Sequence, residues 1–222
     1  ALVVVSCIVF LTRRNVLHIR RLASGDLKGW PRLDANIILV IEIVLMSLFL
    51  TMNATDTLLG QQGVAHYSEH ITGPFVISSL LIPLFDGLSV SSLIAIERTA
   101  WWVHIAGILA FLNYLPYSKH LHIMFAFPNA WFARPENGIM TNMPEIQKEV
   151  ALAMGQDISS NAVLAALPDE PPARFGARDV HDLSWKNLLD AYSCTECGRC
   201  SAACPANTTG KLLSPRAIMM KT

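Results

Sequence analysis

Four cysteines near the end of the sequence form the densest group of potential metal ligands in the chain. They are Cys194, Cys197, Cys200 and Cys204, followed directly by Pro205. This C-x2-C-x2-C-x3-C-P spacing is typical of chains that hold [4Fe–4S] clusters through cysteine thiolates. Small residues such as Gly198 and Ala202 lie between the cysteines, so backbone amides can approach the sulfur atoms. An iron–sulfur cluster exchanges single electrons, and the run therefore predicts electron transfer.

Two alternatives for this run stay open in the sequence. Structural zinc also uses C-x2-C pairs, but such sites usually draw on a second pair, and the fifth cysteine, Cys7, lies alone in an apolar stretch. In two-cluster proteins the last cysteine of a run binds the other cluster. Cys204 therefore completes one site or serves a second cluster. We favour a second cluster beyond this sequence, because the chain begins without a methionine and stops inside an expected helix at 214–220.

Two histidines in an apolar segment are the next residues that could do chemistry. His104 and His122 are eighteen residues apart, or about five turns, so both imidazoles would share one face of a continuous helix. Their axial separation would be about 27 Å, close to the thickness of the hydrocarbon core. Two haems stacked across a membrane need axial ligands placed in this way. The simpler alternatives are an interhelical hydrogen bond for His104 and an interfacial position for His122.

The composition indicates a membrane protein with a soluble appendage. Apolar residues make up 52% of the chain, charged residues 15%, and the mean hydropathy is +0.40. The formal net charge is zero, which gives no electrostatic basis for binding nucleic acid. Because four of the five cysteines belong to the run, no disulfide framework is expected, and a low-potential cluster suits the reducing cytoplasm.

Three apolar segments are expected to cross the membrane, at about 1–11, 35–59 and 95–117. Asp34 can cap the second helix, which exceeds the ~20 residues that a crossing needs. The loop between the first two segments is basic and is therefore cytoplasmic by the positive-inside rule. Its cations are Arg13, Arg14, Arg20, Arg21, Lys28 and Arg32.

An apolar stretch at 75–93 is interrupted by Pro83, Asp86 and Gly87. We interpret it as a re-entrant or interfacial element on the outer side. One further crossing then returns the chain to the cytoplasm, where the cluster is expected. A fourth complete crossing is the alternative.

The chain is expected to be mainly α-helical and to divide into three parts. Residues 1–124 form the membrane domain, 125–183 a cytoplasmic connector, and 184–222 a small [4Fe–4S] domain that this sequence leaves incomplete. A short helix is expected from Pro144 to Gly155, and Ser184 can cap a helix that leads into the first cysteine.

The segment from Trp102 to Ile123 resembles the last helix of the cytochrome b subunit of respiratory nitrate reductase, including its run Pro116-Tyr-Ser-Lys-His-Leu-His122-Ile. The cysteine run resembles heterodisulfide-reductase-type subunits. Together the two resemble bacterial membrane iron–sulfur oxidoreductases that join both domains. The resemblance implies a truncated cytochrome b-type bundle followed by a ferredoxin-like domain, in the inner membrane with the cluster on the cytoplasmic side. It also implies haem ligation by His104 and His122, whose opposite axial ligands are not found here.

These features predict an oxidoreductase of the respiratory chain that transfers electrons between a cytoplasmic partner and the quinone pool. The predicted cofactors are a [4Fe–4S] cluster and two b haems, with quinone as substrate. By family analogy the partner is an electron-transferring flavoprotein, and the chain belongs to a larger complex. One alternative is a haem-free membrane anchor or accessory iron–sulfur subunit, and another is an iron–sulfur sensor or assembly factor.

Overall fold

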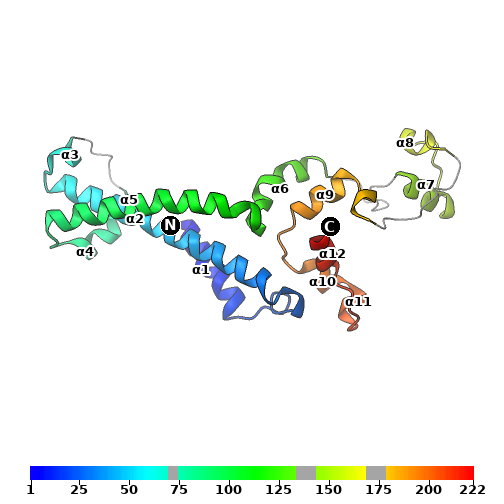
Figure 1. The fold of residues 1–222 in the computed structure, drawn as a ribbon, viewed down its shortest axis with the longest axis horizontal. Helices are drawn as coiled ribbons and strands as arrows, with labels where there is room; N and C mark the ends of the chain where they lie inside the picture. The colour runs from blue at the N-terminus through cyan, green and yellow to red at the C-terminus, as the bar shows by residue number, and fades with distance from the viewer. Residues whose placement is uncertain (70–74, 134–143, 169–178) are drawn as a thin grey trace. The chain divides into compact units, whose positions relative to one another are not determined.

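The fold was analysed in a computed structural model, which describes residues 1–69, 75–133, 144–168 and 179–222. The described residues are mainly helical and contain no β-strand. The chain divides into two compact units, Ala1–His120 and Leu121–Thr222, which we describe separately (Figure 1). The predicted mainly α-helical class is therefore confirmed. Two internal parts of the predicted connector 125–183, at 134–143 and 169–178, lie outside the described residues.

The first unit is built around two long helices with shorter elements at their ends. Its elements are α1 (Leu2–Asn15), η1 (Gly25–Leu27), α2 (Trp30–Gln61), α3 (Ala65–Ser68), η2 (Ser78–Leu81), α4 (Ile82–Phe85), α5 (Val90–Tyr114) and η3 (Leu115–Tyr117), followed by η4 (Lys119–Leu121) at the boundary between the units.

Helix α2 begins earlier than the sequence predicts. Gly29, with φ 78°, precedes its first residue, and Pro31 occupies the first turn, where the missing N–H of proline leaves no helical bond unmade. Asp34 therefore lies inside the helix and is only 1% exposed. The prediction that Asp34 caps this helix is wrong, because Gly29-Trp30-Pro31 already starts it.

Helices α2 and α5 pack side by side and run antiparallel (Figure 1). Asp34 near the start of α2 meets Tyr114 at the end of α5, and Leu45 meets His104 half-way along. Gly107 allows this close approach, since a Cβ there would lie 2.7 Å from Leu45 Cδ2. At the other end, a buried apolar cluster joins both helices to α3; its members are Leu58, Leu59, Tyr67 and Leu93.

Two helical segments, Trp30–Gln61 and Val90–Tyr117, are long and apolar enough to cross a membrane. Only 17% of each most apolar window is buried, whereas a core helix of a soluble protein would be mostly buried. They contain the predicted spans 35–59 and 95–117. The first predicted span, 1–11, lies within the fourteen-residue helix α1.

The interrupted stretch 75–93 contains no long helix of its own. It forms the four-residue elements η2 and α4, and its last residues, from Val90, belong to α5. Neither short element has the ~20 residues that a helical crossing needs. Several apolar side chains of this stretch are exposed, namely Val76, Ile77, Leu80 and Leu84.

The second unit consists of short helices. They are α6 (His122–Trp131), α7 (Pro144–Ala153), α8 (Ala162–Ala165), η5 (Val180–Asp182), α9 (Trp185–Tyr192), α10 (Arg199–Ala203), α11 (Pro205–Thr208) and α12 (Pro215–Lys221). The helices predicted after Pro144 and Ser184 are both present. The Ser184 side chain accepts a hydrogen bond from the Asn187 amide, as an N-cap does.

Helix α6 packs against α9, the helix that leads into the cysteine run. Lys186 Nζ donates to Asn129 Oδ1 at 2.7 Å, and Ser193 Oγ donates to the Phe125 carbonyl at 3.4 Å. These contacts fix the start of the run against a second helix of the same unit.

Candidate functional site

The four cysteines lie on a turn and two short helices that follow α9. Cys194 comes two residues after α9, Cys197 lies in the turn, Cys200 lies in α10, and Cys204 separates α10 from α11. Gly198 starts α10 from a left-handed conformation with φ 74°, which glycine adopts without the strain that a Cβ would cause. Pro205 starts α11 at a position where its missing N–H costs nothing.

The backbone between the first two cysteines turns toward sulfur. Glu196 has φ 49°, an uncommon value for a residue with a side chain, and its amide donates a hydrogen bond to Cys194 Sγ at 3.4 Å. Burial raises the pKa of the Cys194 thiol, and this amide opposes the rise. A backbone amide directed at sulfur favours the thiolate, which is the form that binds iron.

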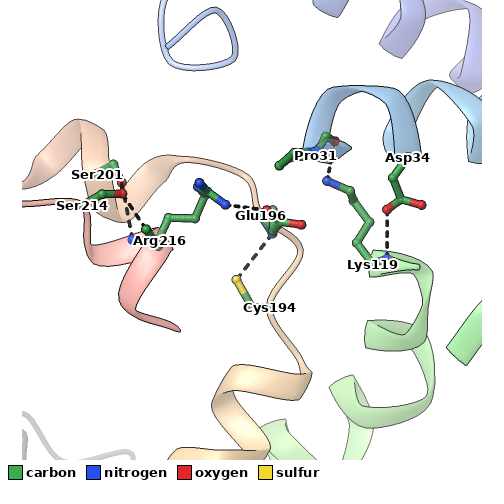
Figure 2. Close-up of polar contacts among 9 residues, drawn as sticks. Pro31, Asp34, Lys119, Cys194, Glu196, Ser201, Ser214 and Arg216 are labelled. Carbon is green, nitrogen blue, oxygen red and sulfur yellow. Dashed lines mark hydrogen bonds and ion pairs between the residues drawn. The ribbon is translucent and has the colours of Figure 1, made fainter. Parts of the chain in front are cut away.

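An ion pair holds Glu196 from its other side. Arg216 Nη1 on α12 lies 2.6 Å from Glu196 Oε2, and the side chains are 12% and 8% exposed, respectively. Figure 2 shows this pair beside Cys194, together with Ser201 and Ser214. The sequence analysis did not single out Glu196. An acidic residue inside a ligand loop was the available signal, but nothing local indicates its partner twenty residues away.

The donor chemistry of the run fits an iron–sulfur cluster, although the thiols are not gathered at one point. Among the described residues, no three His, Cys, Asp or Glu side chains converge closely enough to hold a metal ion. The fit therefore rests on four thiols at the required spacing, the amide on Cys194 Sγ and the left-handed Gly198. Metal sites of this kind rarely pre-exist, because binding itself draws the ligands together.

His104 lies on α5 three residues before Gly107, where this helix approaches α2 closely. Its Nδ1 lies 2.9 Å from the Leu45 carbonyl oxygen, and its ring lies 5.7 Å from that of Phe49. A carbonyl can only accept, so Nδ1 carries a proton, and in the neutral imidazole Nε2 then carries the lone pair. Histidines that bind metals usually have their other nitrogen oriented in this way. The same bond also fits the simpler interpretation, an interhelical tie.

His104 and His122 do not belong to one continuous helix, so the predicted five-turn alignment is wrong. Helix α5 ends at Tyr114, Pro116 follows in a 3-10 turn, and Ser118 is extended with φ −112° and ψ 159°. Proline cannot donate the next helical hydrogen bond, which explains the interruption. His122 is the first residue of α6 and belongs to the second unit. Haem ligation by both residues stays a prediction.

A buried carboxylate ties the end of α5 to the start of α2. Asp34 Oδ1 accepts a hydrogen bond from the Tyr114 hydroxyl at 2.5 Å, and Oδ2 accepts one from the Lys119 amide at 3.0 Å. Lys119 Nζ in turn donates to the Pro31 carbonyl at 2.7 Å (Figure 2). No local pattern reveals this network, because each of its hydrogen bonds joins residues 80 or more positions apart in the sequence.

A second buried carboxylate lies at the opposite end of α5. Glu97 is 5% exposed, accepts a hydrogen bond from Tyr67 OH at 3.0 Å and lies 3.2 Å from Arg98 Nε. Burial, followed by this hydrogen bond, raises the pKa of Tyr67. The pair joins α3 to α5 beside the apolar cluster.

The chain is similar to three curated proteins. It is 29% identical over 94% of its length to the "Probable iron-sulfur-binding oxidoreductase FadF" of Bacillus subtilis. It is 28% identical over 69% of its length to the "EtfAB:quinone oxidoreductase" of Syntrophomonas wolfei. A 51-residue segment is 37% identical to the "Probable membrane-anchored ferredoxin" of Chromohalobacter salexigens.

These relatives support an oxidoreductase role with iron–sulfur electron transfer. The chain spans 25%, 18% and 8% of their respective lengths. No protein-family model matches the chain, and no solved structure matches it. The relatives and the two apolar helices together also indicate membrane association.

Proposed function

We propose that this chain is part of a membrane-anchored protein that transfers electrons between a cytoplasmic redox partner and the quinone pool. The cysteine run, in a chain that also carries two exposed apolar helices, is the observation that supports this most directly. Cys194, Cys197, Cys200 and Cys204 would hold the iron–sulfur group, which supplies one-electron exchange when bound. Cys204 would complete this site or serve a second cluster.

The proposal includes b-type haem, with His104 of the first unit as an axial ligand and His122 of the second unit as a further candidate ligand. The hydrogen bond from His104 Nδ1 to the Leu45 carbonyl supports it, since this bond leaves Nε2 as the metal-binding nitrogen. The interruption at Pro116 removes the argument from a shared helix face, so His122 rests on the family resemblance alone. The multi-pass topology with the cysteine run on the cytoplasmic side belongs to this proposal.

The proposed partners follow from the names of the relatives. One relative is named as an oxidoreductase of quinone and EtfAB, which favours an electron-transferring flavoprotein as the soluble partner and quinone as the substrate. Both assignments are analogies carried over to a chain that covers a small part of that protein.

A second candidate function is a haem-free anchor or accessory iron–sulfur subunit. The geometry of His104 supports this function as well as it supports haem ligation. The hydrogen bond from His104 to the Leu45 carbonyl and its contact with Phe49 join α2 and α5, and this structural role needs no haem. The name of one relative, "Probable membrane-anchored ferredoxin", also supports this candidate.

A reduced-minus-oxidised visible spectrum, with iron and haem quantified, separates the two candidates. The samples are the detergent-purified protein and its variants His104→Ala, His122→Ala and His181→Ala, the last an exposed histidine on η5 that serves as control. We expect b-type bands that are weakened in His104→Ala and His122→Ala, because each variant removes a ligand of one haem, and that are unchanged in His181→Ala. Iron at cluster stoichiometry without haem bands would instead establish the anchor. Absence of both groups would refute both functions.

A further inference from the structure

The helix that follows the cysteine run, α12, contacts the ligand loops through two separate contacts. Arg216 forms the ion pair with Glu196 at 2.6 Å, and Glu196 lies between Cys194 and Cys197. At the other contact, Ser214 Oγ lies 3.4 Å from Ser201 Oγ, next to Cys200 (Figure 2). We call these four residues the α12 clasp.

The Arg216–Glu196 pair is shielded from water on both sides, which distinguishes it from an ordinary surface ion pair. An exposed pair contributes little, because water and salt screen it. In a buried pair, removal of one partner leaves an uncompensated charge and is strongly destabilising. The loop conformation at Glu196 therefore depends on Arg216.

This dependence reaches sulfur through the backbone of Glu196. Its left-handed φ of 49° is unfavourable for a residue with a side chain and must be held by its surroundings. The same residue donates its amide to Cys194 Sγ. Substitution of Arg216 can therefore displace the Glu196 amide, which donates the hydrogen bond to Cys194 Sγ.

The serine half of the clasp fixes where α12 begins. Ser214 caps α12 by accepting the Ala217 amide at 3.2 Å, and the Arg216 amide lies 3.5 Å from Ser201 Oγ. Ser201 is 3% exposed and belongs to α10, the helix that carries Cys200. Arg216 therefore reaches Glu196 from a helix that is already seated on the second ligand segment.

We propose that Arg216 is a positioning residue for the cysteine run, acting through Glu196, and that the charges of this pair set the reduction potential of the bound iron–sulfur group. The inference rests on the proposed function, which places the group at these cysteines. Reduction adds negative charge, so the Arg216 cation favours the reduced form and the Glu196 carboxylate opposes it. The two charges should therefore move the potential in opposite directions.

The test compares the whole protein, purified with its iron, in five forms. They are the unmodified chain, Arg216→Gln, Glu196→Gln, the double variant, and Lys211→Gln, which removes an exposed cation from the same segment. One readout is the rate of iron release to bathophenanthroline disulfonate. The other is the midpoint potential from a redox titration followed by electron paramagnetic resonance.

We expect each single variant to release iron about tenfold faster than the unmodified chain, because each removes one partner of a buried ion pair. Lys211→Gln should match the unmodified chain, and the double variant should release iron more slowly than either single variant. Arg216→Gln should lower the midpoint potential, Glu196→Gln should raise it, and the double variant should lie between them.

Unchanged iron release and potential in both single variants would overturn the inference, as would shifts of the same sign. If the single variants fail to assemble the group, the iron content of the double variant decides: recovery supports the clasp, and equal depletion overturns it. The iron content of the unmodified protein is measured first. If that protein contains no iron–sulfur group, the result refutes the proposed function itself and no variant is compared.

Discussion

Removal of the Asp34 carboxylate should separate the end of α5 from the start of α2. Asp34 is 1% exposed and accepts hydrogen bonds from the Tyr114 hydroxyl and the Lys119 amide. Hydrogen bonds to charged groups contribute about 1.5–3 kcal/mol each. Tyr114 and Lys119 are only half-buried and can recover water, so the lower value applies. Asp34→Ala should therefore lower the free energy of unfolding by about 3 kcal/mol.

The partner variants make this prediction specific. Tyr114→Phe should cost about 1.5 kcal/mol, because it removes one of the two bonds. The double variant Asp34→Ala/Tyr114→Phe should be no less stable than Asp34→Ala, since the shared bond is already lost. Tyr117→Phe is the control, because that ring is 80% exposed. The assay is equilibrium unfolding in mixed micelles, followed by helical circular dichroism. A loss below about 0.5 kcal/mol for Asp34→Ala, or equal effects at Tyr114 and Tyr117, would refute the reasoning.

Two further predictions concern other parts of the chain. Gly198→Ala places a Cβ on a residue with a left-handed backbone conformation (φ 74°). The substitution should destabilise the ligand loop by about 1 kcal/mol and reduce the iron content of the purified protein. Gly25→Ala, where a Cβ meets open space, should leave iron content unchanged. Because burial and the Glu97 hydrogen bond raise the pKa of Tyr67, its contribution to stability is complete below pH ~10 and is lost as the pH rises through the folded-state pKa. The unfolding midpoint of the Tyr67→Phe variant should not show this decrease at alkaline pH. Parallel plots of unfolding midpoint against pH for the unmodified chain and the variant would contradict the prediction.

Features of the sequence that depend on near neighbours were predictable. The helices after Pro144, Ser184 and Ser214 are present, because capping residues and proline act within a single turn. The long apolar helices α2 and α5 could also be predicted, since length and composition alone define a candidate span. The cysteine spacing identified iron–sulfur chemistry for the same reason: its ligands lie within eleven residues.

The alignment of His104 and His122 shows where periodicity misleads. Counting turns assumes an unbroken helix, and Pro116 follows directly after the point where this helix ends. In the structure the chain leaves the helix after Tyr114 and becomes extended at Ser118. Once the helix is interrupted, the number of turns between His104 and His122 no longer predicts whether their side chains share one helix face.

By itself, the sequence determined the electron-transfer chemistry, the helical class and the apolar segments, because each is a local pattern of residue types. Only the tertiary structure decided what the buried charges do. Asp34 was read as a cap and is a tie to Tyr114 and Lys119, and Glu196 depends on Arg216. Such partners are chosen by packing between distant segments, where burial makes an unpaired charge costly, and no pattern within one segment specifies them.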